Sequence, residues 1–473
     1  MSAFVLAVAV AALLLGFLLY VVKNRRSSSN LPPSPPSLPL VGHLHLIGRL
    51  PHRSLHEPHL RYGGGSGGLL LLQLGRRLTL VASTAAAAAD LFRKHDLAFS
   101  SRPHNAAAHK QTYGSRNISF SPYGDHWRRV KKIAVVHLLS QRRVEAFALV
   151  RQTEAAALVA RTRRAAEAGE AVVLKELLYS YTNSVVTREV AGTAGTTAER
   201  LRQLLAETAT MLAGFQADDC ATGLEKKIDD MNGEWDRFLS EIVTEHEHKE
   251  KTTPGQAGRD FLDVLLQLRE DEGHHEGFEL SDDGITAIAK DMIAAATETT
   301  AEFRSFSNAG MGDDRGGWWP TRAMSYLREV VKEVFRLHPT LPLLLPRESK
   351  ETAAAMQGGR YEVPAKIALL VNAWAIGRDP AAWDAPEEFR PERFFLPAQE
   401  AALLPFGTGW RICPGINFAL PVLELALASL LRHFDWEFSG GMRPEDLDRV
   451  EALGLSTPPR VPLVLLPKWK ALA

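Results

Sequence analysis

A short segment around one cysteine dictates much of the C-terminal part of this chain. It runs Pro405-Phe406-Gly407-Thr408-Gly409-Trp410-Arg411-Ile412-Cys413-Pro414-Gly415. Because glycine tolerates tight turns, Gly407 and Gly409 allow peptide N–H groups to point at the sulfur of Cys413. Residues 416–431, which follow, are apolar almost throughout, as in a buried helix. We therefore expect a rigid loop that holds a thiolate metal ligand, with hydrogen bonds that tune it, in front of a core helix.

Cysteine content and charge exclude several classes of protein. The chain has only two cysteines, Cys220 and Cys413, which is too few for a disulfide framework, and they form no CxxC pair for structural zinc. Cys220 is best interpreted as a small buried hydrophobe. Lys plus Arg and Asp plus Glu each total 55, so the net charge is zero and predicts no binding of nucleic acid.

The N-terminus predicts a membrane anchor. Residues 3–22 carry no charge and are rich in Ala, Val and Leu, and about 20 apolar residues suffice to cross a bilayer. A cleaved signal peptide is disfavoured because the run is long and the basic residues follow it instead of preceding it. We assign residues 1–22 to a single transmembrane helix and residues 23–40 to a basic, proline-rich tether. The catalytic domain would lie on the cytosolic side.

Residues 41–473 are expected to form one mainly α domain with a small β part, an α+β fold. Strand-like patterns occur at Leu69–Leu74, Leu78–Val81, Ile367–Val371 and Val461–Leu466, and helical spacing dominates from Trp127 to Ala301. The histidines of residues 245–248 and 273–275 lie among charges, where a solvated loop is a simpler interpretation than a metal site.

The cysteine segment, Phe-Gly-x-Gly-x-Arg-x-Cys-Pro-Gly, resembles the heme-binding loop of the cytochrome P-450 superfamily. The resemblance implies the cytochrome P-450 fold and heme b (iron protoporphyrin IX) as cofactor, with Cys413 as the ligand of the iron. It also implies that Phe406, Gly409, Arg411 and Gly415 contact the cofactor.

Glu333 and Arg336 lie three residues apart, which places both on one face of a helix. In the family this Glu-x-x-Arg pair is buried and joined by the arginine of a Pro-Glu-Arg-Phe motif, which is Arg393 here. The resemblance therefore implies a structural network of Glu333, Arg336 and Arg393 that fixes the heme loop.

Residues 295–300, Ala-Ala-Thr-Glu-Thr-Thr, resemble the oxygen-activating stretch of the family's central helix. The hydroxyl of Thr299 can reach back to a preceding carbonyl and open the helix locally. The resemblance implies Glu298 and Thr299 as the catalytic pair that delivers protons. Ala296 stands where the family usually has glycine.

Further resemblances concern the cations that bind heme propionates. Residues 127–132 are similar to the family's Trp-x-x-x-Arg helix, with Lys131 where arginine is usual, so that the bidentate fork is lost. Trp127, Lys131, Arg347 and Arg411 match propionate-binding positions. Arg128, Arg129 and Lys132 would leave a basic face suited to an acidic reductase.

The chain departs from the family between the oxygen helix and Glu333. Two further helices are usual there, but the interval is roughly half the expected one and residues 305–320 are dense in Gly and Asp without helical periodicity. One alternative is therefore an inactive membrane-anchored paralogue, or a mis-spliced product lacking the helices between residues 305 and 325. A heme-thiolate isomerase or dehydratase is a further alternative, which Glu298 and Thr299 disfavour.

The main expectation is a monooxygenase that inserts one oxygen atom from O2 into a small apolar or aromatic plant metabolite. Residues 121–127 and 371–380 resemble the plant microsomal (A-type) branch, and the central helix resembles grass family-71 enzymes acting on indole or benzoxazinoid-type compounds. The resemblance implies electrons from NADPH through NADPH-cytochrome P-450 reductase, and attachment to the endoplasmic reticulum membrane. Substrate contacts are expected from residues 102–121, 340–345 and 453–456.

Overall fold

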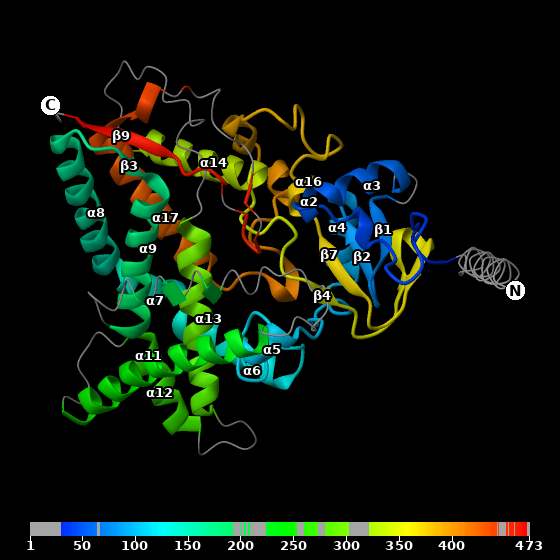
Figure 1. Cartoon of the computed structure of the whole chain (residues 1–473), viewed down its shortest axis with the longest axis horizontal. Helices are drawn as coiled ribbons and strands as arrows, with labels where there is room; N and C mark the ends of the chain where they lie inside the picture. The colour runs from blue at the N-terminus through cyan, green and yellow to red at the C-terminus, as the bar shows by residue number, and fades with distance from the viewer. Residues whose placement is uncertain are drawn as a thin grey trace, which may run out of the picture. The chain divides into compact units, whose positions relative to one another are not determined.

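The computed structural model describes residues 30–63, 67–192, 200, 203–204, 207–208, 224–252, 260–272, 280–301, 321–441, 443, 451–452, 454–457 and 459–470. The chain divides into two compact units, one built from residues up to Pro103 together with Leu343–Ala382, and the other from His104–Pro342 and Trp383 onward. Figure 1 shows the elements in chain order. The predicted anchor, residues 1–22, and residues 23–29 of the tether lie outside the described residues.

The first unit contains the larger sheet. Its strands are β1 (Leu69–Leu74), β2 (Arg77–Ala82), β4 (Arg347–Glu348) and β7 (Ala368–Val371), in the order β1-β2-β7-β4, and a second sheet pairs β5 (Ala353–Ala355) with β6 (Tyr361–Val363). Its helices are η1 (Leu44–Leu46), α2 (Pro51–Ser54), α3 (His56–Tyr62), α4 (Ala85–Lys94), α15 (Met356–Gly359) and α16 (Ala373–Ile376).

Burial of apolar side chains explains why these strands form a sheet. β1 and β2 pair antiparallel with Leu71 opposite Leu80, and β2 pairs parallel with β7, with Val81 opposite Leu370. Leu70 and Leu72 of β1, Val81 of β2 and Leu370 of β7 form a small core with Leu55. The turn between β1 and β2 uses Gly75 at φ +57°, a conformation that glycine adopts without strain.

The second unit is mostly helical. Its described helices up to residue 301 are α5 (Ala106–Gln111), α6 (Asp125–Lys132), the π-helical η2 (Ile133–Leu138), α7 (Gln141–Ala146), α8 (Ala148–Ala168), α9 (Leu174–Ala191), α11 (Leu224–Thr252), α12 (Phe261–Glu272) and α13 (Asp282–Ala301). The later ones are α14 (Thr321–Leu337), η3 (Pro391–Phe395), η4 (Pro397–Ala402), η5 (Gly409–Arg411), α17 (Ile416–His433) and η6 (Ser439–Gly441). A small sheet has the order β3-β9-β8, from β3 (Val172–Val173), β8 (Phe434–Phe438) and β9 (Val464–Trp469).

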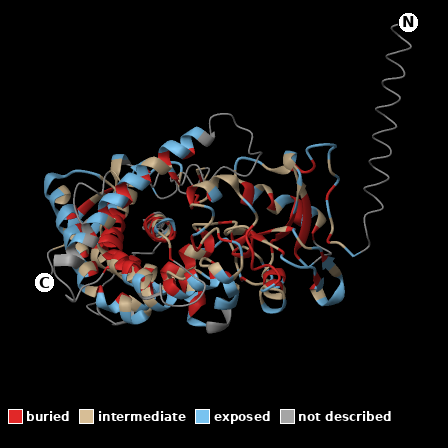
Figure 2. Cartoon of the chain, turned by 90° about the horizontal axis from the view of Figure 1, so that it is seen from below, coloured by how far each residue is buried: buried red, intermediate tan, exposed pale blue. Residues whose placement is uncertain are grey.

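One hydrophobic core holds this unit together. α13 packs along α9, and α17 packs against α8, α9, α13 and α14. In α14, Val330, Val331 and Val334 recur at helical spacing and are all buried. Buried residues, red in Figure 2, concentrate on the inner sides of the helices, whereas outer turns are largely exposed. The predicted fold class, mainly α with a small β part, is confirmed.

Within the described residues, one helix, α17, is long and apolar enough to span a membrane. Its residues Phe418, Val422, Leu423 and Leu430 are buried in the core of the helical unit. Packing inside the protein therefore accounts for its apolar composition.

Candidate functional site

The cysteine loop is a tightly bonded turn. Gly407 and Gly409 have φ values of +65° and +68°, which favour glycine. The N–H of Gly407 donates to the carbonyl of Leu404 at 3.1 Å, and the N–H of Cys413 donates to the carbonyl of Phe406 at 2.9 Å. The loop thus closes on Phe406 and returns the chain to the start of α17, three residues after Cys413.

Burial and nearby charges act on the thiol of Cys413 in opposite directions. Burial raises the pKa of the Cys413 thiol, and the charge of Asp291 raises it as well, whereas a hydrogen bond from the Gly415 N–H and the charge of Lys131 lower it. A thiol in this setting stays protonated until a cation replaces the proton. A Cβ at Gly415 would lie 3.7 Å from Sγ, so a side chain there would lie against the sulfur.

Three predicted propionate-binding residues lie together beside this loop. The Arg411 guanidinium is buried, 4.0 Å from the centroid of the Trp127 ring, and donates to the carbonyls of Ile118 at 3.3 Å and Ser121 at 2.7 Å. The indole N–H of Trp127 donates to the same Ile118 carbonyl at 3.1 Å. Lys131 donates to the Trp410 carbonyl and lies 5.0 Å from the Trp127 ring centroid. Two cations and an indole N–H thus flank the cysteine loop.

This set of groups fits heme. A partly buried cysteine would supply the iron ligand. The cations Arg411 and Lys131 donate to uncharged carbonyls, and propionate groups would offer them charged acceptors instead.

Arg347 belongs to the other unit and lies on β4. Its guanidinium donates to Asp96 at 2.6 Å and lies 4.6 Å from the Phe92 ring centroid. Burial lowers the pKa of Arg347, and the charge of Asp96 opposes this effect. Its predicted contact with a propionate stays a prediction.

The structure brings Glu333, Arg336 and Arg393 into one buried network, with exposures of 0%, 1% and 5%. Arg336 binds Glu333 through two parallel hydrogen bonds, Nε to Oε2 at 2.7 Å and Nη2 to Oε1 at 2.8 Å, and Arg393 Nε reaches Oε1 at 3.2 Å. The backbone N–H of Arg390 also donates to Oε1 at 2.7 Å. The remaining guanidinium groups bind the carbonyls of Asp384, Ala385, Pro386 and Glu388.

An aromatic contact joins this network to the cysteine loop. Phe335 lies on α14 between Glu333 and Arg336 and packs edge-to-face on Phe406, with ring centroids 5.5 Å apart. Phe406 is also the residue whose carbonyl accepts the N–H of Cys413. Fixing α14 through Glu333 therefore fixes one wall of the loop.

The predicted catalytic residues Glu298 and Thr299 lie in the last turns of α13, and their side chains are outside the described part of the chain. Thr297, just before them, is fully buried, and its hydroxyl has no hydrogen-bond partner among the described residues. A buried hydroxyl without a partner is uncommon.

The sequence analysis missed Asp291, which ties α13 to the residues behind the cysteine loop. Its carboxylate accepts the N–H groups of Ile118 at 3.1 Å and Ser119 at 3.0 Å, and the Ser119 hydroxyl at 2.7 Å. Burial raises the pKa of Asp291, and the bonds from Ser119 and Ile118 oppose this effect. The sequence signal that could have indicated this role is an aspartate in the middle of a mostly apolar stretch of helix.

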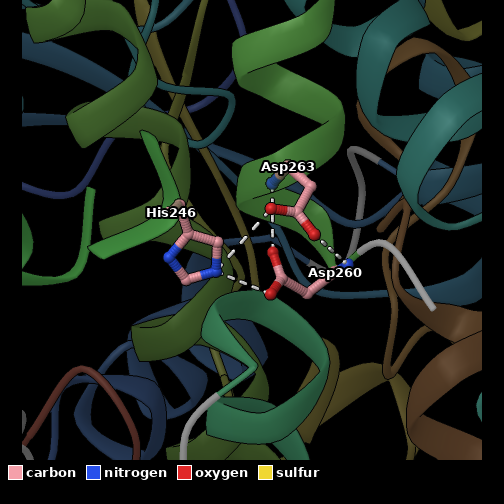
Figure 3. Close-up of side chains that lie close together, drawn as sticks. All are labelled: His246, Asp260 and Asp263. Atoms are coloured by element: carbon pink, nitrogen blue, oxygen red, sulfur yellow. Dashed lines mark hydrogen bonds and ion pairs between the residues drawn. The ribbon is translucent and has the colours of Figure 1, made fainter. Parts of the chain in front are cut away.

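The predicted solvated loop around residues 245–248 is wrong for His246, which is buried in α11 with 1% exposed. Figure 3 shows it facing Asp260 and Asp263. Its Nε2 lies 2.7 Å from Asp260 Oδ2, and its Nδ1 lies 2.7 Å from the Ile242 carbonyl. Burial lowers the pKa of His246, but the hydrogen bond and charge of Asp260 outweigh it, so that the pKa is raised.

The two aspartates also cap α12 reciprocally. The N–H of Asp260 donates to Asp263 Oδ2 at 3.1 Å, and the N–H of Asp263 donates to Asp260 Oδ1 at 3.0 Å. Both His246 nitrogens face acceptors, so the imidazolium itself supplies the positive charge that a metal ion would bring. The histidines at 274 and 275 lie outside the described residues.

Comparisons with known proteins agree with the family that the cysteine loop resembles. The family model described as cytochrome P-450 matches residues 32–305 and 317–465. The chain is 36% identical to cytochrome P-450 71A2 of Solanum melongena, over 94% of each chain. It is also 36% identical to norfluorocurarine oxidase of Strychnos sp, over 96% of each, and to premnaspirodiene oxygenase of Hyoscyamus muticus, over 95% of each.

The fold agrees as well. A zebra fish cytochrome P-450 structure with progesterone superimposes with a TM-score of 0.72 at 24% identity, covering 88% of this chain and 99% of that one.

Proposed function

This chain belongs to the cytochrome P-450 family of heme-thiolate monooxygenases, and we propose that it inserts one oxygen atom from O2 into a C–H bond of a small apolar or aromatic plant metabolite. The observation that carries the proposal is the arrangement around Cys413: a partly buried sulfur three residues before α17, with Arg411 and Lys131 close by. Plant relatives named as oxidases and oxygenases support the substrate class.

Each predicted cofactor contact has a distinct task in this proposal. Cys413 is the ligand of the heme iron, and the Gly415 N–H moderates the charge on its sulfur. Trp127, Lys131 and Arg411 hold the propionates, with Arg347 as a fourth contact. Phe406, Gly409 and Gly415 shape the surface on which the ring lies. When bound, heme supplies the redox-active iron at which O2 is reduced.

Glu298 and Thr299 are proposed as the proton-delivering pair. The Glu298 carboxyl would take protons from water, and the Thr299 hydroxyl would pass them into the reaction centre. Their place in α13, about two turns beyond Asp291, supports this assignment, because Asp291 bonds the segment that Arg411 also contacts.

The proposed electron donor is NADPH-cytochrome P-450 reductase. The cations Arg128, Arg129 and Lys132 are exposed on α6, and the same helix carries Trp127 and Lys131 on its inner side. A basic surface this close to the cofactor contacts suits an acidic electron-transfer partner. The proposed location is the endoplasmic reticulum membrane, with residues 1–22 as the anchor and the enzyme in the cytosol.

The substrate proposal goes one step beyond the family. Two relatives are named norfluorocurarine oxidase and premnaspirodiene oxygenase. Our candidate substrate class for this chain is an indole-type compound, as proposed from the resemblance of its central helix to grass family-71 enzymes. A panel of indole and terpenoid compounds, incubated with the reconstituted enzyme and reductase and analysed for oxygenated products, tests this class.

An inactive paralogue is the second candidate, and one observation favours it: the family match is interrupted between residues 305 and 317. A mis-spliced product lacking helices between residues 305 and 325 would give the same interruption. Sequencing the transcript distinguishes the two, because a message that restores the segment identifies a splicing product. A heme-thiolate isomerase or dehydratase would bind heme equally well but would not consume O2.

The reduced, carbon monoxide-bound difference spectrum of membranes that contain this chain is the deciding experiment. We expect a thiolate-type Soret band that Cys413→Ser abolishes and Cys220→Ser leaves intact. Absence of the band from the unaltered chain would rule out the oxidase proposal for this polypeptide. A band without product-linked O2 consumption would favour the isomerase.

A further inference from the structure

α13 carries an almost fully buried lysine, Lys290, with 3% exposed. Its ammonium Nζ donates to the carbonyl of Gln111 at 3.0 Å and to the side-chain carbonyl of Asn232 at 3.0 Å. Gln111 is the last residue of α5, and Asn232 lies on α11. The amine also lies 5.2 Å from the Trp235 ring centroid and 5.9 Å from that of Tyr113. It thus occupies the point where α5, α11 and α13 meet.

This cation lacks a matching anion. Within the described residues, its two hydrogen-bond acceptors are neutral carbonyl oxygens and no carboxylate forms an ion pair with it. Burial lowers the pKa of Lys290 to about 7, and the charge of Asp236 opposes this effect only in part. The Asp236 carboxylate is itself bonded by the Tyr113 hydroxyl. A buried cation without a counterion is costly, and groups of this kind gather at functional sites.

The neighbouring amide is also unsatisfied. The Gln111 side chain is 1% exposed, and neither its Nε2 nor its Oε1 has a hydrogen-bond partner among the described residues. Most buried side-chain amides are bonded to protein or water. The end of α5 therefore combines a buried cation with an amide whose donor and acceptor are both unused.

The position of Lys290 connects it to the proposed reaction. α5 lies within residues 102–121, the segment expected to contact substrate, and Asp291, the next residue of α13, bonds Ile118 and Ser119 of the same segment. We propose that Lys290 is a specificity-determining residue whose ammonium binds the carboxylate of an acidic substrate at the end of α5. The proposal deepens the proposed function and rests on it.

The chemistry of binding is simple. A substrate carboxylate replaces the neutral Gln111 carbonyl as acceptor and gives Lys290 the anion it lacks, while the Gln111 amide donates a second hydrogen bond. A carboxylate next to the amine favours its charged form, so binding takes up a proton wherever Lys290 is neutral beforehand. Affinity for an acid should therefore fall as the pH rises through about 7. The titratable groups around Lys290 are Asp236 on α11 and Tyr113, which follows α5.

The test measures binding of two probes of the same shape, indole-3-carboxylate and indole-3-carboxamide, by titration calorimetry with the full-length chain at pH 6.5 and 8.5. We expect about tenfold tighter binding of the carboxylate at pH 6.5, as one charge-assisted hydrogen bond implies, and a smaller preference at pH 8.5. Lys290→Met should remove the preference. Lys290→Arg should keep it without its pH dependence, and Lys94→Met, which removes an exposed lysine paired with Asp90, should change nothing.

The outcomes separate this inference from the oxidase proposal. Equal affinity for both probes, binding of neither at millimolar concentration, or a preference that survives Lys290→Met overturns the role of Lys290. Circular dichroism of each variant identifies loss of folding, in which case Lys290→Arg alone decides. The carbon monoxide spectrum of the same preparation reports heme binding independently, so a normal band without carboxylate preference rejects only the role of Lys290.

Discussion

Replacing Glu333 by Gln should destabilise the helical unit far more than the loss of an ordinary ion pair. The Glu333 carboxylate accepts four hydrogen bonds, two from Arg336 and one each from the Arg393 side chain and the Arg390 backbone. Gln keeps the shape and one carbonyl oxygen. It loses the charge, however, and turns an NH2 group towards guanidinium N–H donors.

The expected cost follows from burial. Both arginines are at most 5% exposed, so Glu333→Gln removes the buried negative charge with which both of them pair. Removing one partner of a buried ion pair costs about 3–5 kcal/mol. A domain is usually stable by only about 5–15 kcal/mol, so this change consumes a large part of the free energy of unfolding.

Urea unfolding, followed by tryptophan fluorescence, measures this loss. Trp383 is a useful reporter because its ring centroid lies 5.3 Å from the Arg336 guanidinium carbon. The matched control is Glu400→Gln, since Glu400 pairs at 2.6 Å with Lys332, the residue before Glu333, but is largely exposed. The control should cost less than about 1 kcal/mol. Equal losses in the two variants would refute the argument from burial.

Three further predictions follow from single residues. Because the pKa of His246 is raised above its ordinary value of 6.5, its pair with Asp260 should stabilise the fold fully below pH 6.5 and lose this effect as the pH rises through the folded-state pKa. The difference in unfolding free energy between the unaltered chain and His246→Gln, measured from pH 6 to 9, should therefore shrink as the pH rises. A constant difference would contradict the pairing. Asp291→Asn should lower the free energy of unfolding by about 1–3 kcal/mol in thermal denaturation, since it weakens three partly buried hydrogen bonds, and unchanged stability would argue against their importance. Thr299→Ala should raise O2 consumption per product formed in the reconstituted enzyme, and unaltered coupling would remove Thr299 from proton delivery.

Local patterns were enough to predict much of the fold. Short apolar runs indicated the strands that became β1, β2 and β7, and three-residue spacing put Glu333 and Arg336 on one helix face. The family resemblance and the fold class followed from the cysteine segment and the helical periodicity. These features depend on residues close together in the sequence, which is why sequence reasoning reaches them.

Long-range contacts account for what was missed. His246 looked solvent-exposed because its neighbours in the sequence are charged, yet Asp260 and the packing of α11 bury it. Lys290 and Asp291 take their partners from segments more than a hundred residues away or on another helix, and no local pattern predicts such pairings. The ring of carbonyls from residues 384–388 around Arg336 and Arg393 is a property of the folded loop alone.

The parallel pairing of β2 with β7 has a consequence for how the protein is made. The first strand pair emerges early from the ribosome, but its partner β7 starts only at Ala368. Until then the apolar edge of β2 has no strand beside it, and such edges invite association with other chains. Nascent chains of this protein should therefore depend on chaperones through most of translation. In a nascent chain stalled on the ribosome before residue 368, a protease should cleave near that edge of β2. In the released full-length chain, β7 should protect the edge from cleavage.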